Sequence, residues 1–113
     1  MIETAAALSC LDQICAVDGL AGIYIGPADL AISMGVDVVG ATRNSDVLDA
    51  IVRSHRAATD AGLVTGIHAS EGKTGRAMAK LGFQMITLAA ESQALRRGAV
   101  EHLREAADSD RPS

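Results

Sequence analysis

Short apolar runs alternate along this chain with segments in which apolar residues recur every three or four positions. The short runs are rich in β-branched residues and predict buried strands, whereas the periodic segments predict amphipathic helices. The expected strands lie at 22–26, 63–69 and 83–89, and the expected helices lie at 5–15, 30–34, 45–61, 70–81 and 92–106. Residues 1–3 look like the end of a further strand, because a helix signal begins directly after them at Thr4.

This alternation predicts an α/β fold with parallel strands, because a helix between two strands makes the right-handed crossover that parallel pairing requires. With the strand end at residues 1–3 included, the pattern contains four βα units, which is half of a (β/α)8 TIM barrel. In a barrel of that kind the chemistry lies on the loops that follow the strands. Glu3, Asp29 and His68 are all expected at that end of the sheet.

The stretch Gly-Ile-Tyr-Ile-Gly-Pro-Ala-Asp-Leu, which ends at Leu30, is the most informative local sequence. Its Gly-Pro pair ends a strand, and Pro27 has no N–H and a φ angle suited to the start of a helix. The amides of Ala28, Asp29 and Leu30 are then expected to be free, and free amides at a helix start attract anions. In the alternative interpretation, Asp29 only caps the short helix at 30–34.

Two carboxylates, Glu3 and Asp29, follow neighbouring predicted strands and can therefore meet in the fold. With no His or Cys beside them, such a pair suits a hard divalent cation such as Mg²⁺ or Mn²⁺. The alternative is a solvated Glu at a frayed end together with a capping Asp. His68 either contacts a substrate or is a hydrogen-bonded residue of the rim, and its role stays open, whereas His55 and His102 are expected to be solvated.

Composition narrows the remaining possibilities. The chain has 113 residues, of which only Tyr24 and Phe83 are aromatic, so we expect one domain with an aliphatic core. A net charge of −4 and scattered Lys and Arg argue against a nucleic acid or a membrane surface as partner. Because no signal sequence and no apolar run of about 20 residues is present, we expect a cytoplasmic protein. Cys10 and Cys15 are expected as reduced thiols on different faces of a helix.

Four pieces of the chain belong together: Met-Ile-Glu-Thr at 1–4, Val-Asp-Gly at 17–19, the stretch at 22–30 and Ser-Met-Gly at 33–35. In combination they closely resemble the second half of the HpcH/HpaI aldolase family, the metal-dependent class II pyruvate aldolases. The resemblance implies the C-terminal half of a TIM barrel over 1–107, followed by a polar tail at 108–113. It also implies a homo-oligomer, often with the last helix exchanged between subunits.

By this resemblance, Glu3 and Asp29 would be the two protein ligands of a divalent metal cation, Mg²⁺ or Mn²⁺. Gly26, Pro27, Ala28 and Asp29 would form the substrate-binding segment, in which the amides of Ala28 and Asp29 hold the carboxylate of a pyruvate-like oxo acid. The implied reaction is cleavage of a 4-hydroxy-2-oxo acid to pyruvate and an aldehyde, or the reverse. It would make the protein a carbon–carbon lyase.

The chain departs from the family pattern in one major respect. The family's general-base His, the acid that supports it and the Arg that steadies the oxo group lie in the first half of the barrel, and this sequence has no counterpart. We therefore expect a fragment that begins at an internal Met and is inactive alone. The last rim, Leu-Ala-Ala-Glu at 88–91, also differs from the Gly and Asp that members usually carry. The alternative prediction is a small doubly wound α/β module that binds an anion or serves regulation without catalysis.

Overall fold

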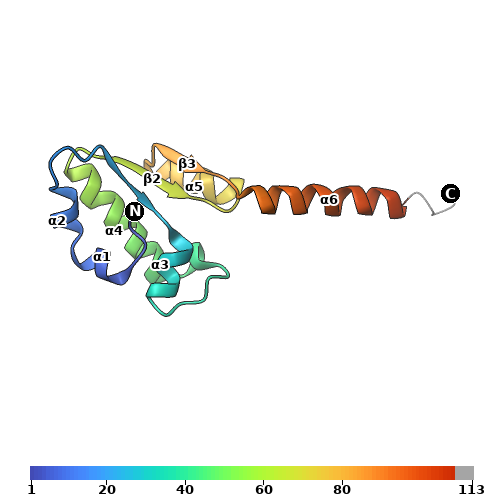
Figure 1. Cartoon of the computed structure of the whole chain (residues 1–113), viewed down its shortest axis with the longest axis horizontal. Helices are drawn as coiled ribbons and strands as arrows, with labels where there is room; N and C mark the ends of the chain where they lie inside the picture. Colours follow the sequence, from blue (N-terminus) through green and yellow to red (C-terminus); the bar gives the residue numbers. More distant parts are fainter. Residues whose placement is uncertain (109–113) are drawn as a thin grey trace.

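A computed structural model describes residues 1–108 and has a three-stranded parallel sheet with helices packed against it (Figure 1). The elements in chain order are α1 (Ala5–Ser9), α2 (Leu11–Cys15), β1 (Gly22–Ile25), α3 (Pro27–Ser33), the 3-10 helix η1 (Ala41–Arg43), α4 (Ser45–Asp60), β2 (Val64–His68), α5 (Gly72–Leu81), β3 (Met85–Thr87) and α6 (Glu91–Asp108). The predicted tail at 108–113 lies outside the described residues, except for Asp108 at the end of α6.

The sheet order is β1-β2-β3, and both pairings are parallel. Neighbours in the sheet are therefore neighbours in the chain, as in a barrel built from successive βα units. Four such units are not confirmed, because the segment before α1 contributes only a bridge between Ile2 and Ile25. The last strand is also shorter than the predicted 83–89, since only Met85–Thr87 pairs with β2.

The two faces of the sheet differ in burial. Ile25 and Ile67 are fully buried on the face covered by helices, whereas Val64 and Met85 are about half exposed on the other. Successive side chains of a strand point to opposite faces, so Tyr24, His68 and Thr87 also belong to the exposed side. We call this side, with its residues Tyr24, Val64, His68, Met85 and Thr87, the open face. A doubly wound sheet has helices on both faces, so the doubly wound arrangement in the alternative prediction is wrong, whereas its functional part stays a prediction.

The first predicted helix is interrupted. Thr4 caps α1 as expected, since its hydroxyl accepts a hydrogen bond from the Ala7 N–H at 3.1 Å. At Cys10 the backbone leaves helical geometry, so α1 and α2 are separate turns rather than one helix over 5–15. The break leaves Cys10 exposed and Cys15 buried, and both are free thiols, as predicted. Burial, and secondarily the charge of Asp12, raise the pKa of the Cys15 thiol.

The helices α4 and α5 cover the buried face. α4 begins at Ser45 as predicted, with Asn44 accepting hydrogen bonds from the first-turn amides, and it ends before Gly62, which has φ +72°. α5 begins at Gly72 rather than at 70. Its Met78 is buried as expected, but Leu81 is exposed. Ala77, which was expected to face inward, is exposed as well.

His55 on α4 is half-buried, so the prediction that it is solvated is wrong. Its Nδ1 lies 2.9 Å from the hydroxyl of buried Thr65, and its ring stacks on Phe83 with ring centroids 4.5 Å apart. His102 on α6 is exposed as expected and lies 3.6 Å from the carboxylate of Glu105.

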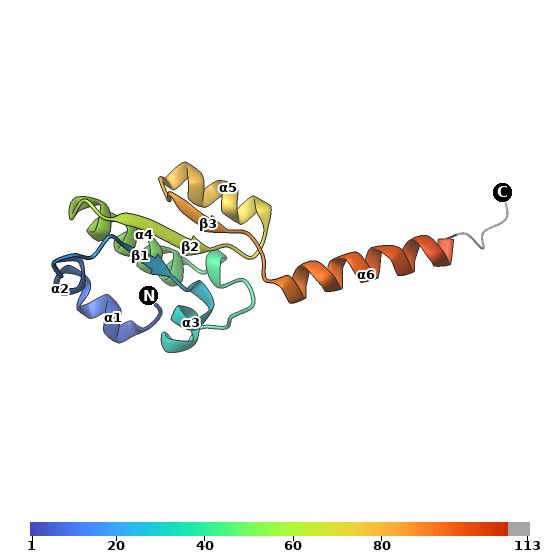
Figure 2. The same ribbon diagram turned by 45° about the horizontal axis from the view of Figure 1, so that its top comes forward.

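The last helix, α6, projects from the rest of the molecule in both views (Figures 1 and 2). It raises the radius of gyration to 17.8 Å, compared with about 13 Å for a compact domain of this size. No residue of α6 whose side chain is described is buried, and Leu95 and Leu103 are at least 70% exposed. No helix within residues 1–108 is long and apolar enough to cross a membrane.

Candidate active site

The first predicted site residue, Glu3, is placed by backbone pairing. The Ile2 N–H donates to the Tyr24 carbonyl at 2.8 Å, and the Gly26 N–H donates to the Ile2 carbonyl at 3.1 Å. Because Ile2 is buried among the core residues, the next side chain points to the opposite face. The Glu3 carboxylate oxygen Oε2 would lie only 3.4 Å from a Cβ built on Gly26. The structure therefore brings Glu3 and Gly26 together.

The other predicted residues form the start of α3. Gly26 is the N-cap, Pro27 is the first helical residue, and Asp29 is exposed in the first turn. Asp29 is thus not the N-cap, and the interpretation that it only caps a helix at 30–34 is wrong. The Leu30 N–H is not free either, because it donates to the Gly26 carbonyl at 3.0 Å. The amides left without a helical acceptor are those of Ala28 and Asp29.

The two carboxylates are therefore carried by adjacent parallel segments and follow the carboxyl ends of both. Among residues 1–108, no three His, Cys, Asp or Glu side chains converge as a metal-binding group. Glu3 and Asp29 therefore remain the two acidic residues predicted at this rim. A site with few carboxylates is typical of Mg²⁺, which keeps several water ligands.

His68 lies at the same end of the sheet, at the carboxyl end of β2. Its Nδ1 is 2.8 Å from the hydroxyl oxygen of Thr87, which in turn is 2.5 Å from the Tyr24 hydroxyl. These three residues come from three neighbouring strands and lie on the open face. His68 is therefore a hydrogen-bonded rim residue, as one of the two predictions had it, and its second ring nitrogen faces away from this contact.

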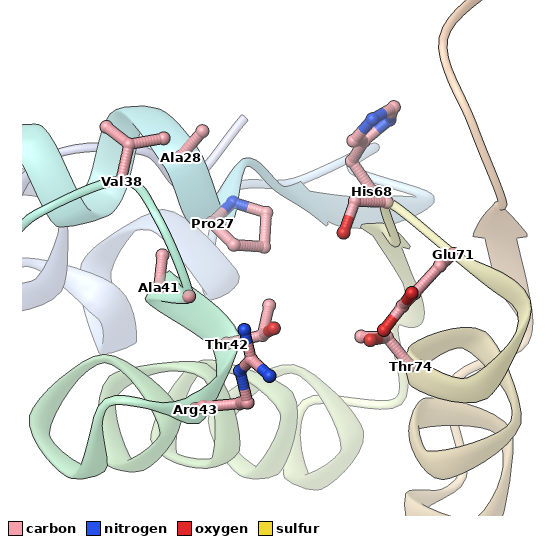
Figure 3. A pocket seen from close by; sticks show the side chains of 11 residues that line it. Pro27, Ala28, Val38, Ala41, Thr42, Arg43, His68, Glu71 and Thr74 are labelled. Carbon is pink, nitrogen blue, oxygen red and sulfur yellow. The ribbon is translucent and has the colours of Figure 1, made fainter. Parts of the chain in front are cut away.

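A pocket of about 250 Å³ opens beside the start of α3, between η1 and the loop that leads into α5 (Figure 3). The guanidinium of Arg43 lies against Gly40 and faces the pocket from one side, while Glu71 and Thr74 face it from the other. The ring of His68 points away from the pocket (Figure 3). The lining of the pocket does not include Glu3 or Asp29. It consists of Pro27, Ala28, Val38, Gly40, Ala41, Thr42, Arg43, His68, Ser70, Glu71 and Thr74.

Sequence reasoning missed the partners of His68 and the pocket residue Arg43. The sequence did contain a signal for the partners of His68, because a glycine inside a strand marks a place where another group approaches the backbone closely. Gly66 is that residue, since a Cβ built on it would lie 2.7 Å from the Tyr24 ring. For Arg43 no such signal exists, because it follows an irregular stretch without periodicity.

The parallel order of the strands, with acidic residues after their carboxyl ends, is the arrangement found in folds built from successive βα units, of which the TIM barrel is one. A family model described as HpcH/HpaI aldolase/citrate lyase matches residues 1–98. The chain belongs to this family, and the predicted resemblance is confirmed.

Individual relatives agree with this assignment. A hydroxypyruvate/pyruvate aldolase of Rhizorhabdus wittichii is 38% identical over 79% of this chain and 36% of the relative. A 4-hydroxy-2-oxo-heptane-1,7-dioate aldolase of Klebsiella pneumoniae is 35% identical over 87% of this chain and 36% of the relative. The crystal structure of an HpcH/HpaI aldolase/citrate lyase family protein from Burkholderia cenocepacia matches with a TM-score of 0.86 and 32% identity, over 93% of this chain and 40% of that one. The chain thus spans less than half the length of the relatives it matches.

Proposed function

We propose that this chain forms the metal-bearing half of a class II pyruvate aldolase. The reaction would cleave a 4-hydroxy-2-oxo acid to pyruvate and an aldehyde, or run in reverse. The observation that carries the proposal is the position of the Glu3 carboxylate beside Gly26, directly before the helix turn that carries Asp29. Two relatives that are named aldolases of oxo acids support the same reaction class.

Glu3 and Asp29 would hold the divalent cation, Mg²⁺ or Mn²⁺. Both donors are carboxylates, which is the ligand type that hard cations prefer. A Cβ built on Gly26 would lie at van der Waals distance from the Glu3 carboxylate, so Glu3 reaches the segment that leads directly to Asp29. When bound, the cation supplies Lewis acidity that stabilises negative charge on the 2-oxo oxygen as the carbon–carbon bond breaks.

The start of α3 would hold the carboxylate of the oxo acid. The N–H groups of Ala28 and Asp29 have no acceptor within the helix and can donate to that carboxylate. Buried Pro27 fixes the chain direction at this point and contributes no competing N–H. The general-base His and the Arg of the family have no counterpart in this sequence, so we propose that the chain needs the rest of a barrel for activity.

Completion of the barrel would also account for the exposed surfaces. The segment at Ile2 and the strand β3 form the two ends of the sheet, and their unpaired backbone groups invite further strands. The exposed apolar side chains of α6 favour a homo-oligomer in which a neighbouring subunit covers them. The described part of the predicted domain at 1–107 would then correspond to four βα units of eight.

Thermal unfolding of the chain with Mn²⁺ and oxalate tests the metal site, because oxalate mimics an oxo acid. We expect joint stabilisation of about 2.7 kcal/mol when oxalate is present at 100 times its Kd. Glu3→Gln and Asp29→Asn should each abolish it. Asp18→Asn, a matched change in an exposed turn at the other end of β1, should leave it intact.

Two outcomes would contradict the proposal. Equal stabilisation of the Asp29→Asn variant would exclude Asp29 as a ligand. Stabilisation by inorganic phosphate without any divalent cation would instead favour an anion-binding module that has no catalytic role.

A further inference from the structure

The hydrogen-bonded group on the open face has a specific construction. Tyr24 lies on β1 and Thr87 on β3, and β2 runs between these two strands. The Tyr24 ring reaches across β2 only because Gly66 has no side chain, since a Cβ there would lie 2.7 Å from the ring atom Cδ2. His68 follows two residues later on the same face, directly opposite Thr87 in the register.

The Thr87 hydroxyl is the centre of this group, and it has one hydrogen to donate. Within residues 1–108, the Tyr24 hydroxyl has no other hydrogen-bond acceptor. Within this group of three residues, both hydroxyl hydrogens find acceptors when Tyr24 donates to Thr87 and Thr87 donates to His68 Nδ1. The ring hydrogen of His68 then resides on Nε2, which has no partner within the described part of the chain.

This orientation matters for the rim. The ring of His68 points away from the Arg43 pocket (Figure 3), and it lies on the open face, as does the Glu3 side chain. We propose that Tyr24 and Thr87 are positioning residues that fix the tautomer of His68, so that its Nε2–H donates to an oxygen of the bound oxo acid. This inference rests on the proposed function, and it assigns a substrate preference: ligands with a hydroxyl or carbonyl oxygen beyond the chelating oxo acid.

Nitrogen NMR of the His68 ring in the 113-residue chain tests the positioning step without any ligand. Wild type should show a hydrogen on Nε2 and none on Nδ1, whose lone pair accepts the Thr87 hydroxyl hydrogen. Thr87→Val keeps the shape of the side chain but removes the hydroxyl, so this variant should show a mixture of the two His68 tautomers. Tyr24→Phe removes the donor to Thr87, so this variant should show a weaker preference for the Nε2–H tautomer. Thr87→Ser keeps a hydroxyl and serves as the matched control, which should resemble wild type. A Thr87→Val spectrum identical to that of wild type would overturn the inference.

Binding of hydroxypyruvate and oxalate in the presence of Mn²⁺ tests the substrate contact. Thr87→Val and His68→Phe should weaken hydroxypyruvate binding roughly fivefold, the typical effect of one hydrogen bond, while oxalate binding changes less. Thr87→Ser should restore the wild-type affinity. Equal losses for both ligands, or no loss for either, would overturn the assigned preference.

The two measurements separate the two proposals. If wild type binds neither acid with Mn²⁺, the proposed function and the substrate contact both fail, while the NMR spectra still report whether the positioning group exists. If both acids bind but the variants bind as wild type does, the aldolase site stands and the role of His68 is refuted.

Discussion

Replacing Thr65 by Val should destabilise the fold through a single lost hydrogen-bond partner. Thr65 is fully buried, and its hydroxyl lies 2.9 Å from both His55 Nδ1 and Gln84 Oε1. Since Oε1 can only accept, the hydroxyl donates to Gln84 and accepts from the His55 N–H. Gln84 keeps a second donor in the variant, the Thr65 backbone N–H at 2.9 Å. The His55 N–H loses the one acceptor that it has within residues 1–108.

The expected loss of unfolding free energy comes from His55, because Gln84 keeps a hydrogen-bond donor in the variant and His55 keeps no acceptor within residues 1–108. A buried donor without an acceptor costs about 1–3 kcal/mol, and His55 is only half-buried, so the lower part of that range applies. The methyl group that Val gains returns at most about 0.8 kcal/mol. The net loss should be about 1 kcal/mol, which lowers Tm by about 4 °C in a domain of this size.

Urea unfolding followed by circular dichroism measures this loss. The midpoint should fall by about 0.5–1 M at an unchanged slope m. Thr59→Val, the same change on the exposed side of α4, should stay within about 0.5 kcal/mol. In a His55→Leu background the Thr65→Val change should cost almost nothing, because no donor remains to be orphaned. Equal costs in both backgrounds would refute the reasoning.

Three further predictions concern the rest of the chain. Gly22→Ala should strongly lower the free energy of unfolding, because its Cβ would lie 2.5 Å from a backbone oxygen of β2. Gly98→Ala in α6 meets no atom within 4 Å and should raise the free energy of unfolding by about 0.5–1 kcal/mol. Chemical denaturation of both variants measures the two effects. Since the pKa of Cys15 is raised in the fold, stability should fall as pH rises past the ordinary thiol pKa, and Cys15→Ala should remove that slope between pH 7 and 10. Light scattering should show an oligomer that Leu103→Lys weakens, and an unchanged mass would contradict the role given to α6.

The sequence alone was sufficient for features that depend on neighbouring residues. The strand cores, the cap at Thr4 and the left-handed Gly62 after α4 all follow from local propensity and turn chemistry. The family was also readable from sequence, because its signature at 22–30 is contiguous.

Only the tertiary structure decided features that depend on distant residues. The imidazole of His55 is sheltered because Thr65 and Phe83 pack against it, although Arg53 and Arg56 lie beside it in the sequence of α4. The contact of Tyr24 with Thr87 depends on the order of three strands and on Gly66 between them. Periodicity reports which face a side chain occupies, but the residue that lies opposite is set by register and packing, which no local pattern contains.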